Sequence, residues 1–291
     1  MPADVYLIFN PGAQSGKSRD FFARIHAALA EREIDYRHDI TTCLEDAEDL
    51  ARQANLAGCK SIVAVGGDGT LNRVINGFYA PDGKRLSQAR LGVIYTGTSP
   101  DFCLSHGLPV RDPGKAVEIL AYGNVRSIGI GRIAYADGRL RHFACCANIG
   151  LGAQLARAAN CGIRGRLGDK AGTFFSLLRV LKGYLPVDLV VNGQKQDGVF
   201  NLSIGKTRYV ASGLKIANAL KADDTRFYLL CIQNRIPFHI FHLYSGRPLA
   251  LEYAECVDIT GDAEVEFDGD ACGKLPVRIA PAPPIGLIVS P

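Results

Sequence analysis

Short apolar runs alternate with amphipathic segments through residues 1–125. The apolar runs have the length of buried strands and cover residues 5–9, 36–40, 62–65 and 91–95. Between the first two runs, apolar residues such as Phe21, Ile25 and Leu29 recur at helical spacing. Because strands that alternate with helices usually pair in parallel, the pattern predicts an α/β domain with a parallel sheet over residues 1–125.

The pattern changes near Asn124, and residues 126–283 contain short β-like runs. These runs cover residues 127–135, 140–147, 187–191, 200–204, 227–232 and 263–267. Turn pairs such as Asp137-Gly138 and Asn192-Gly193 favour hairpins between them. We therefore expect a mainly antiparallel second domain, a β-sandwich, interrupted by one helical segment over residues 154–184. The apolar end of the chain, residues 284–291, can return as a strand to the first domain.

The segment Gly66-Gly67-Asp68-Gly69-Thr70 follows one of the buried strands and precedes a helical pattern. A glycine turn between a strand and a helix presents backbone N–H groups and the positive helix end to a phosphate. The carboxylate of Asp68 would repel a bare phosphate, so its presence favours a Mg²⁺ ion between the two. A purely structural alternative is a tight turn with an Asp cap, but a cap does not require three glycines. The segment predicts a nucleotide-phosphate site with Mg²⁺.

Two more loops follow strands of the same expected sheet. Asn10-Pro11-Gly12 leads into Ser15, Gly16 and Lys17, which can open a helix and cup a phosphate. One residue too few separates Gly12 from Gly16-Lys17 for a P-loop, and we reject that motif. Loops at the carboxyl ends of parallel strands meet at one sheet edge, which strengthens the prediction of a ligand site there.

The third loop is Gly97-Thr98, followed by Pro100 and Asp101. Thr98 can donate a hydrogen bond to a phosphate, and Asp101 can face the reacting group. A plain helix start with proline in its first turn explains the same residues about as well.

Asp268-Gly269-Asp270 follows an alternating strand near the end of the chain. Two carboxylates around a glycine suit a general base and its neighbour. An Asp-Gly hairpin turn is the alternative, and for this segment taken alone it is the better explanation.

The composition is that of a globular protein with a substantial core, because 47% of residues are hydrophobic and 21% are charged. A net charge of +4 is too small to indicate a nucleic-acid binder. No apolar run approaches the about 20 residues that a bilayer span needs, and no signal peptide is visible. Nine cysteines without a Cys-x-x-Cys pair favour reduced thiols and a cytoplasmic protein.

The expected helical segment near residues 154–185 is strongly basic. It carries Arg157, Arg164, Arg166, Lys170, Arg179 and Lys182 against the single acid Asp169, with phenylalanine and leucine residues among them. Such a segment can rest on an anionic membrane surface. Packing of its apolar face into the core is the alternative.

Taken in order along the chain, these motifs resemble the diacylglycerol kinase catalytic-domain family, which includes soluble bacterial lipid kinases and the sphingosine and ceramide kinases. The glycine loop by itself is shared with NAD kinases and phosphofructokinases, whose first-domain fold the chain is therefore expected to share. The Asn148-Ile149-Gly150-Leu151-Gly152 motif and the ending from Asp268 to Pro276 are more specific to the family. The loops and the resemblance assign nucleotide contacts to Asn10, Pro11, Ser15, Gly16, Lys17, Thr41, Gly66, Gly67, Asp68, Gly69, Thr70, Asn72 and Thr98.

The resemblance implies transfer of the γ-phosphoryl group of Mg·ATP to a lipid hydroxyl at a membrane surface. Asp68 would help to hold Mg²⁺, and Asp268 or Asp270 would deprotonate the alcohol. Family members also carry a structural Mg²⁺ in the β domain, which by position would use Asp224 and the carbonyls of Lys221 and Arg226. The lipid acceptor and a homodimer are left open.

Three residues depart from the family pattern. Pro100 stands where the family usually has Asn, Asp270 where it has Glu, and Thr225 where it has Gly. A homologue that binds nucleotide or lipid without turnover therefore stays open. The shared glycine loop also leaves open a kinase of NAD or another soluble alcohol.

Overall fold

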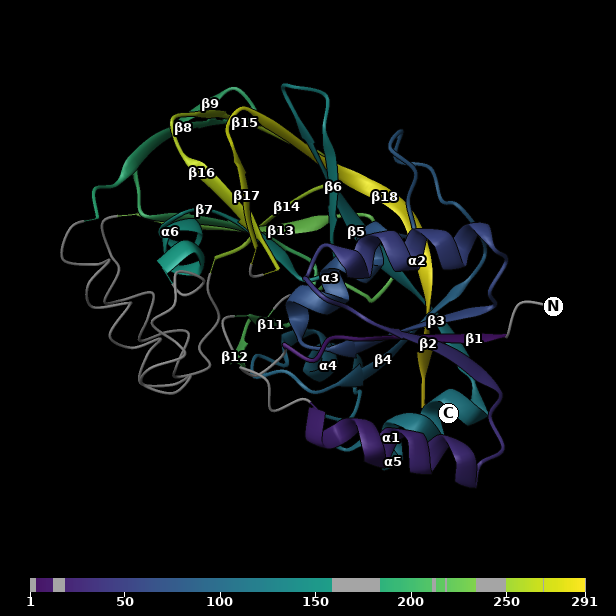
Figure 1. Cartoon of the computed structure of the whole chain (residues 1–291). Helices are drawn as coiled ribbons and strands as arrows, with labels where there is room; N and C mark the ends of the chain where they lie inside the picture. Colours follow the sequence, from purple (N-terminus) through teal and green to yellow (C-terminus); the bar gives the residue numbers. More distant parts are fainter. Residues whose placement is uncertain are drawn as a thin grey trace. The chain divides into compact units, whose positions relative to one another are not determined.

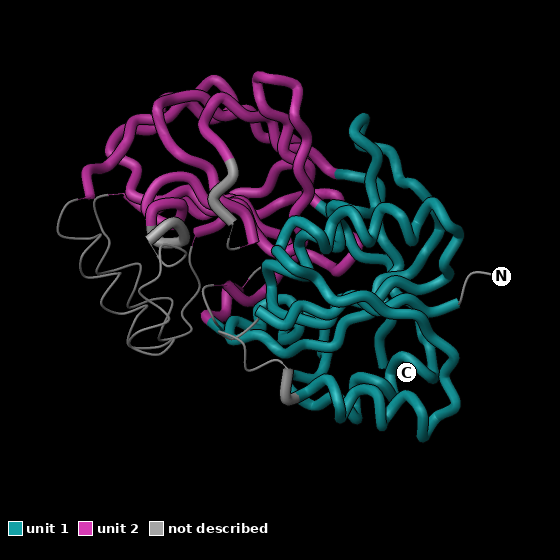
Figure 2. Tube along the Cα trace, in the orientation of Figure 1, with its two compact units in different colours: residues 1–130, 211–213, 282–291 teal, residues 131–210, 214–281 magenta. Residues whose placement is uncertain are grey.

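The computed structural model describes residues 4–12, 19–158, 184–210, 213–217, 219–233, 250–268 and 270–290. The chain divides into two compact units (Figure 2). Unit 1 comprises residues 1–130, 211–213 and 282–291, and unit 2 comprises residues 131–210 and 214–281. We expected the boundary after residue 125, whereas the chain leaves unit 1 after Ile130 and returns to it at Ala282.

Unit 1 is an α/β domain built on a parallel sheet (Figure 1). Its strands are β1 (Val5–Phe9), β2 (Tyr36–Ile40), β3 (Ser61–Gly66), β4 (Arg90–Tyr95) and the end of β18 (Val277–Val289). They lie in the order β2-β1-β3-β4-β18, and every one of these pairs is parallel. Its helices are α1 (Arg19–Glu31), α2 (Asp46–Leu56), α3 (Asp68–Asn76), α4 (Asp101–His106) and α5 (Pro113–Tyr122).

Helices cover both faces of the unit 1 sheet. Helices α1 and α5 lie on one face and α2 and α3 on the other (Figure 1). On the α1 and α5 face, Phe9 and Val65 of the sheet pack against Ile25 and Leu29 of α1 and Val117 of α5, and all five are fully buried. A parallel sheet covered on both faces explains why its strands read as continuous apolar runs.

Unit 2 contains an antiparallel sheet in the order β14-β13-β10-β7-β16-β17. These strands are β7 (Cys146–Gly150), β10 (Asn201–Gly205), β13 (Phe227–Ile232), β14 (Glu252–Ala254), β16 (Glu264–Phe267) and β17 (Asp270–Lys274). The remaining strands are β5 (Asn124–Tyr135), β6 (Leu140–Phe143), β8 (Val187–Val191), β9 (Gln194–Val199), β15 (Val257–Gly261), the first part of β18, and the short pair β11 (Tyr209–Val210) and β12 (Leu214–Lys215). Helix α6 (Leu151–Ala158) follows β7 directly.

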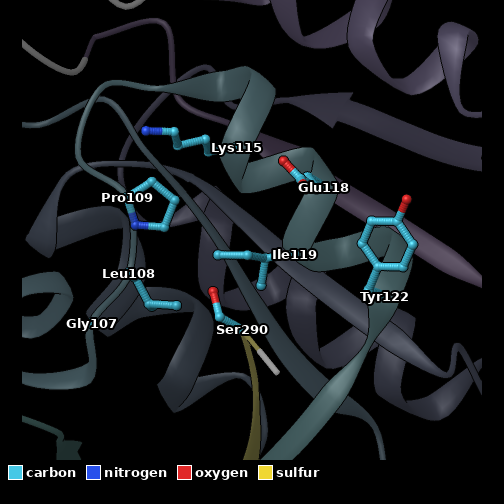
Figure 3. Close-up of a pocket in the computed structure, with 8 residues that line it drawn as sticks. All are labelled: Gly107, Leu108, Pro109, Lys115, Glu118, Ile119, Tyr122 and Ser290. Carbon is cyan, nitrogen blue, oxygen red and sulfur yellow. The ribbon is translucent and has the colours of Figure 1, made fainter.

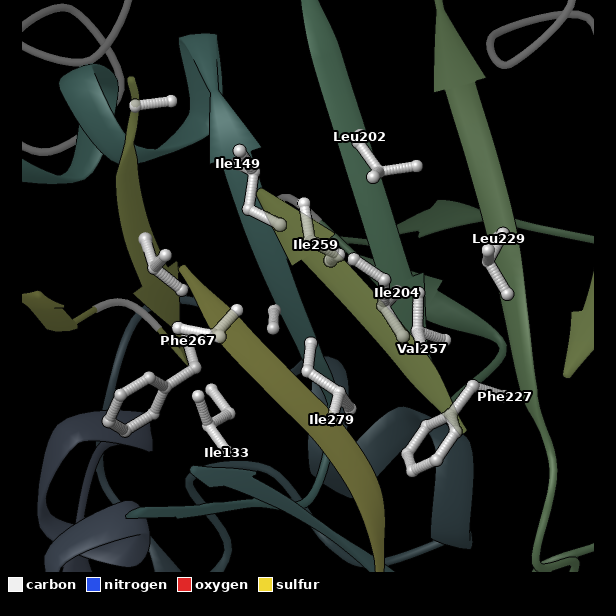
Figure 4. Packing of buried hydrophobic residues seen from close by; sticks show 14 of the residues in the cluster. Ile133, Ile149, Leu202, Ile204, Phe227, Leu229, Val257, Ile259, Phe267 and Ile279 are labelled. Atoms are coloured by element: carbon white, nitrogen blue, oxygen red, sulfur yellow. The ribbon is translucent and has the colours of Figure 1, made fainter. Parts of the chain in front are cut away.

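The core of unit 2 lies between two layers of strands (Figure 4). Ile149 and Ile204 from the antiparallel sheet pack in one cluster with Ile259 of β15 and Ile279 of β18, and all four are fully buried. The layers confirm the expected fold class, an α/β domain with a parallel sheet and a second domain rich in antiparallel strands.

One expected strand is wrong as a single element. The run over residues 140–147 is divided into β6 and β7, which belong to different sheets. The N–H groups of Ala144, Cys145 and Cys146 donate to the carboxylate of Asp268 instead of to a neighbouring strand. A distant side chain therefore interrupts an apolar run that would otherwise continue as one strand.

The expected helical segment from residue 154 is described only as far as the end of α6, and residues 159–183 lie outside the described part of the chain. Among the described residues, no helix combines the length and apolar composition that a membrane span requires.

Candidate functional site

The predicted phosphate loop lies at the carboxyl edge of the unit 1 sheet. Strand β3 ends at Gly66, Gly67 occupies the N-cap position, and α3 begins at Asp68. In the strand register, Phe9 pairs with Val65 and Gly66 pairs with Tyr95. The loops that follow β1, β3 and β4 therefore begin at the same edge of the sheet.

Two of these loops approach each other at backbone distance. A Cβ atom on Gly97 would lie 2.5 Å from the Cα atom of Gly67 and 2.7 Å from the Tyr95 hydroxyl. No side chain fits in that space, so the loop geometry requires glycine at residue 97. Arg111 braces the same loop, because its Nε donates to the Gly97 carbonyl at 3.1 Å.

The carboxylate of Asp68 is held by a buried tyrosine. The hydroxyl of Tyr95, a residue that is 2% exposed, donates to Oδ2 of Asp68 at 2.9 Å. Burial raises the pKa of Tyr95 and the charge of Asp68 raises it further, so the phenol stays protonated as a donor. Because Asp68 also begins a helix, the positive helix end stabilises its negative charge. A fixed, hard oxygen donor of this kind fits a Mg²⁺ ion that arrives with a nucleotide.

Asn10 ties the end of β1 to the first turn of α3. Its Nδ2 donates to Oγ1 of Thr70 at 2.8 Å, and its Oδ1 accepts from the Gly12 N–H at 2.9 Å. Thr70 is 2% exposed and fills the space above Gly66, where a Cβ would lie 2.4 Å from its Oγ1. The hydrogen bond brings together Asn10 and Thr70, which sequence reasoning assigned to separate loops. Ser15, Gly16 and Lys17 lie outside the described residues.

Thr41 and Asn72, two other predicted contacts, are interior residues of unit 1. Thr41 is 3% exposed, and its N–H donates to the Phe9 carbonyl at 2.8 Å. Asn72 is 2% exposed and its side-chain oxygen accepts from Asn76 Nδ2 at 3.1 Å. Both residues are thus buried, with hydrogen bonds inside unit 1.

The loop after β4 is half-buried from Thr98 to Asp101. Pro100 is the N-cap residue of α4 and makes no side-chain cap bond. The Oδ1 atom of Asp101 accepts from the Gly213 N–H at 2.6 Å, so this carboxylate holds Gly213 at the start of α4.

In unit 2, the carboxylate of Asp268 receives three backbone hydrogen bonds. The N–H of Ala144 donates to its Oδ2 at 2.8 Å, and those of Cys145 and Cys146 donate to its Oδ1 at 3.0 and 3.1 Å. Asp268 also has a left-handed backbone with φ of 47°. Asp270 begins β17 opposite Phe267, and its side chain lies outside the described part. The side chain of Asp268 thus holds the backbone of residues 144–146 in place.

The residues expected to hold a structural Mg²⁺ do not fit one. The carboxylate of Asp224 accepts from its neighbour Arg226, at 3.0 Å from Nε and 2.8 Å from Nη2. The Arg226 carbonyl, an expected metal ligand, accepts instead from Lys206 Nζ at 3.3 Å. Burial lowers the pKa of Lys206 to about 8, which leaves the amine largely charged at neutral pH. No group of three or more His, Cys, Asp or Glu side chains in the described residues is arranged to hold a metal ion.

A pocket of about 360 Å³ lies elsewhere in unit 1 (Figure 3). Leu108, Pro109, Ile119 and Tyr122 supply much of its lining. None of its lining residues is a predicted phosphate or metal contact. We place the candidate site at the glycine loops, where backbone N–H groups and a helix N-terminus suit a phosphate.

Sequence reasoning missed Tyr95, Arg111 and Lys206. Tyr95 carried a usable signal, since a tyrosine at the end of a buried strand needs a partner for its hydroxyl. The other two residues contact backbone carbonyls, and a sequence pattern does not reveal such contacts.

Residues 4–133 match the family model of the diacylglycerol kinase catalytic domain. Among curated proteins, the chain is 33% identical over 127 residues to a diacylglycerol kinase of Bacillus subtilis, an alignment that covers 44% of this chain and 41% of that protein. It is 28% identical over 242 residues to a probable YegS-like lipid kinase of Chromohalobacter salexigens, covering 79% of this chain and 71% of the relative.

The fold has solved counterparts. The crystal structure of a diacylglycerol kinase from Bacillus anthracis superposes with a TM-score of 0.75 at 22% identity, over 99% of this chain and 97% of that one. At this sequence identity, the structural similarity supports a shared fold and nothing further. Residues 4–133 are therefore similar to the diacylglycerol kinase catalytic domain, and the fold agrees with that similarity.

Proposed function

We propose that the protein is an ATP-dependent lipid kinase that transfers the γ-phosphoryl group of Mg·ATP to a lipid hydroxyl. The observation that carries the proposal is the Asp68 carboxylate at the start of α3, oriented by the Tyr95 hydroxyl at 2.9 Å beside a glycine loop. Phosphoryl transfer needs positioned charges around the phosphates more than covalent chemistry, and this arrangement suits that need.

Each part of the site has a separate role in the proposed reaction. The backbone of Gly66 to Gly69 and the N-terminus of α3 bind phosphate oxygens, and the Asn10–Thr70 hydrogen bond keeps this loop in shape. Asp68 would help to hold a Mg²⁺ ion, which would supply positive charge to neutralise the phosphates. As the acceptor oxygen forms its bond to phosphorus and the bond to the ADP oxygen breaks, a carboxylate takes the hydroxyl proton.

That carboxylate belongs to the Asp268-Gly269-Asp270 turn. Because Asp268 is engaged with three backbone N–H groups, we assign it the positioning of the turn and assign proton transfer to Asp270. The assignment rests on the hydrogen bonds of Asp268 and on the place of Asp270 at the start of β17.

The test is a kinase assay with Mg·ATP and vesicles that contain diacylglycerol, a sphingoid base or ceramide. We expect one lipid class to be phosphorylated, and Asp68→Ala to abolish the product while its circular dichroism matches that of the wild type. Turnover of NAD or glycerol without any lipid product would support a soluble-alcohol kinase instead. Nucleotide binding with no product from any acceptor would support a non-catalytic homologue.

We also propose that the lipid is reached at an anionic membrane surface. The support is the charge of residues 154–185, with six cations and one acid among apolar residues. Co-sedimentation with vesicles that contain phosphatidylglycerol tests this, and we expect binding that weakens as salt rises. Equal recovery with neutral and anionic vesicles would contradict it.

A further inference from the structure

Lys206 of unit 2 directs its ammonium group at backbone oxygens. The residue directly follows β10, and its Nζ donates to the carbonyl of Asp224 at 2.8 Å and to that of Arg226 at 3.3 Å. The same nitrogen lies 4.4 Å from the ring centroid of Phe227. Two carbonyl oxygens and an aromatic face form a site for a cation. The ammonium group of Lys206 occupies this site.

The carboxylate nearest to Lys206 is already paired with another cation. Arg226 folds back on Asp224 through its backbone N–H at 2.9 Å and through Nε and Nη2 at 3.0 and 2.8 Å. The carboxylate of Asp224 is therefore neutralised by Arg226 and also faces the charge of Lys206. A Mg²⁺ ion at this place would need oxygen ligands close around it and would be repelled by both cationic side chains.

We propose that Lys206 is a built-in cation that replaces the structural divalent metal in this loop, so that residues 221–227 are held in place without a metal ion. The loop is closed on the other side by the Asp224 N–H, which donates to the Lys221 carbonyl at 3.2 Å. Lys206 joins this loop to the end of β10 as a metal ion would join separate ligands. The proposal concerns the architecture of unit 2 and stands whether or not the protein transfers phosphate to a lipid.

Hydrogen exchange of residues 219–227 in the nucleotide-free protein tests the proposal. For the wild type we expect the same protection in EDTA and in 5 mM Mg²⁺ (a concentration on the order of cellular levels). Loss of protection in EDTA would overturn it. Lys206→Met, which keeps the length of the side chain but removes its charge and donors, should lower protection in this segment by at least about 10-fold, the equivalent of one buried hydrogen bond or more.

Lys195 provides the matched control in the same unit. It is an exposed lysine that pairs with Asp197 at 2.8 Å, so Lys195→Met should leave the protection of residues 219–227 unchanged. Protection that is equal in Lys206→Met and the wild type would contradict the role of Lys206.

A second measurement does not depend on any variant. Wild-type crystals grown with Mn²⁺ should show no anomalous peak between the carbonyls of Asp224 and Arg226. A Mn²⁺ peak at that position would show that the metal site exists, and the proposal would be wrong.

Discussion

The amide nitrogen of Asn10 donates to the hydroxyl of Thr70 at 2.8 Å, and this bond links the end of the first strand to the helix that follows the glycine loop. The two residues are 60 positions apart in the sequence, yet the segments that contain them follow β1 and β3 at the same edge of the sheet. The bond joins two of the loops expected to surround the nucleotide, so either partner can be changed to test whether the loops act together.

Thr70→Val removes the hydroxyl and keeps the shape of the side chain. We expect it to lower the free energy of unfolding by about 1–2 kcal/mol, because Asn10 Nδ2 loses a partner at a part-buried position. ATP affinity, measured by calorimetry, should fall with it. Thr70→Ser retains the hydroxyl and should bind ATP nearly as well as the wild type. Equal ATP affinities in the two variants would show that the Asn10–Thr70 hydrogen bond does not contribute to nucleotide binding.

Gly97→Ala tests the close approach of two loops. The added Cβ would lie 2.5 Å from the Cα atom of Gly67, so the loops must separate. We expect a loss of roughly 1–3 kcal/mol in unfolding free energy and a higher KM for ATP. Gly114→Ala in α5 is the control, since its Cβ would meet only Asp112 Oδ1 at 3.6 Å and alanine suits a helix.

Tyr95→Phe removes the donor to Asp68 and leaves the buried ring in place. A hydrogen bond to a charged group contributes about 1.5–3 kcal/mol, so kcat should fall by roughly 10- to 100-fold. Thermal unfolding should show that the fold persists. An unchanged kcat would mean that Asp68 is oriented without the tyrosine, and the proposed arrangement of the site would need revision.

Asp268→Asn should destabilise unit 2. An amide in place of the carboxylate can turn an NH₂ group toward the N–H groups of residues 144–146, which currently donate to oxygen. We expect about 2–4 kcal/mol lower unfolding free energy, measured by urea denaturation. Asp270→Asn should instead abolish phosphoryl transfer at near-wild-type stability. The reverse pattern would make Asp268 the base.

His142 is expected to make the fold sensitive to acid. It is 3% exposed, and burial, with Arg132 and Arg141 nearby, lowers its pKa to about 3. Between this value and the ordinary pKa near 6.5, the unfolded chain binds a proton that the folded chain does not, so stability falls as pH drops through that window. The His142 contribution should approach roughly 1.4 kcal/mol per pH unit.

His142→Gln should lose this part of the pH dependence. Other groups also titrate in acid, so the quantity to compare is the difference between wild type and variant in urea denaturation from pH 7 to pH 4. Parallel curves for the two proteins would show that His142 is not the group responsible.

Local patterns predicted the first unit well, and the reasons are physical. A buried parallel strand leaves a continuous apolar run, and the glycine loop after residue 65 is readable because only glycine tolerates such close backbone contacts. The division of residues 140–147 into two strands was not readable, because the carboxylate responsible comes from Asp268, 124 positions away from Ala144. The structural metal was expected from resemblance, and the contacts of Lys206 with two backbone carbonyls, on which our contrary proposal rests, leave no sequence pattern.

The path of β18 has a consequence for how the protein can be made and divided. The first part of this strand pairs with β15 in unit 2, and Gly286 and Leu287 pair with β4 in unit 1. During synthesis, the parallel sheet of unit 1 therefore lacks one strand until the residues after 281 have left the ribosome. A separate unit 1 cannot be obtained by cutting the chain after residue 130, and would require a linker from there to residue 282 in place of unit 2.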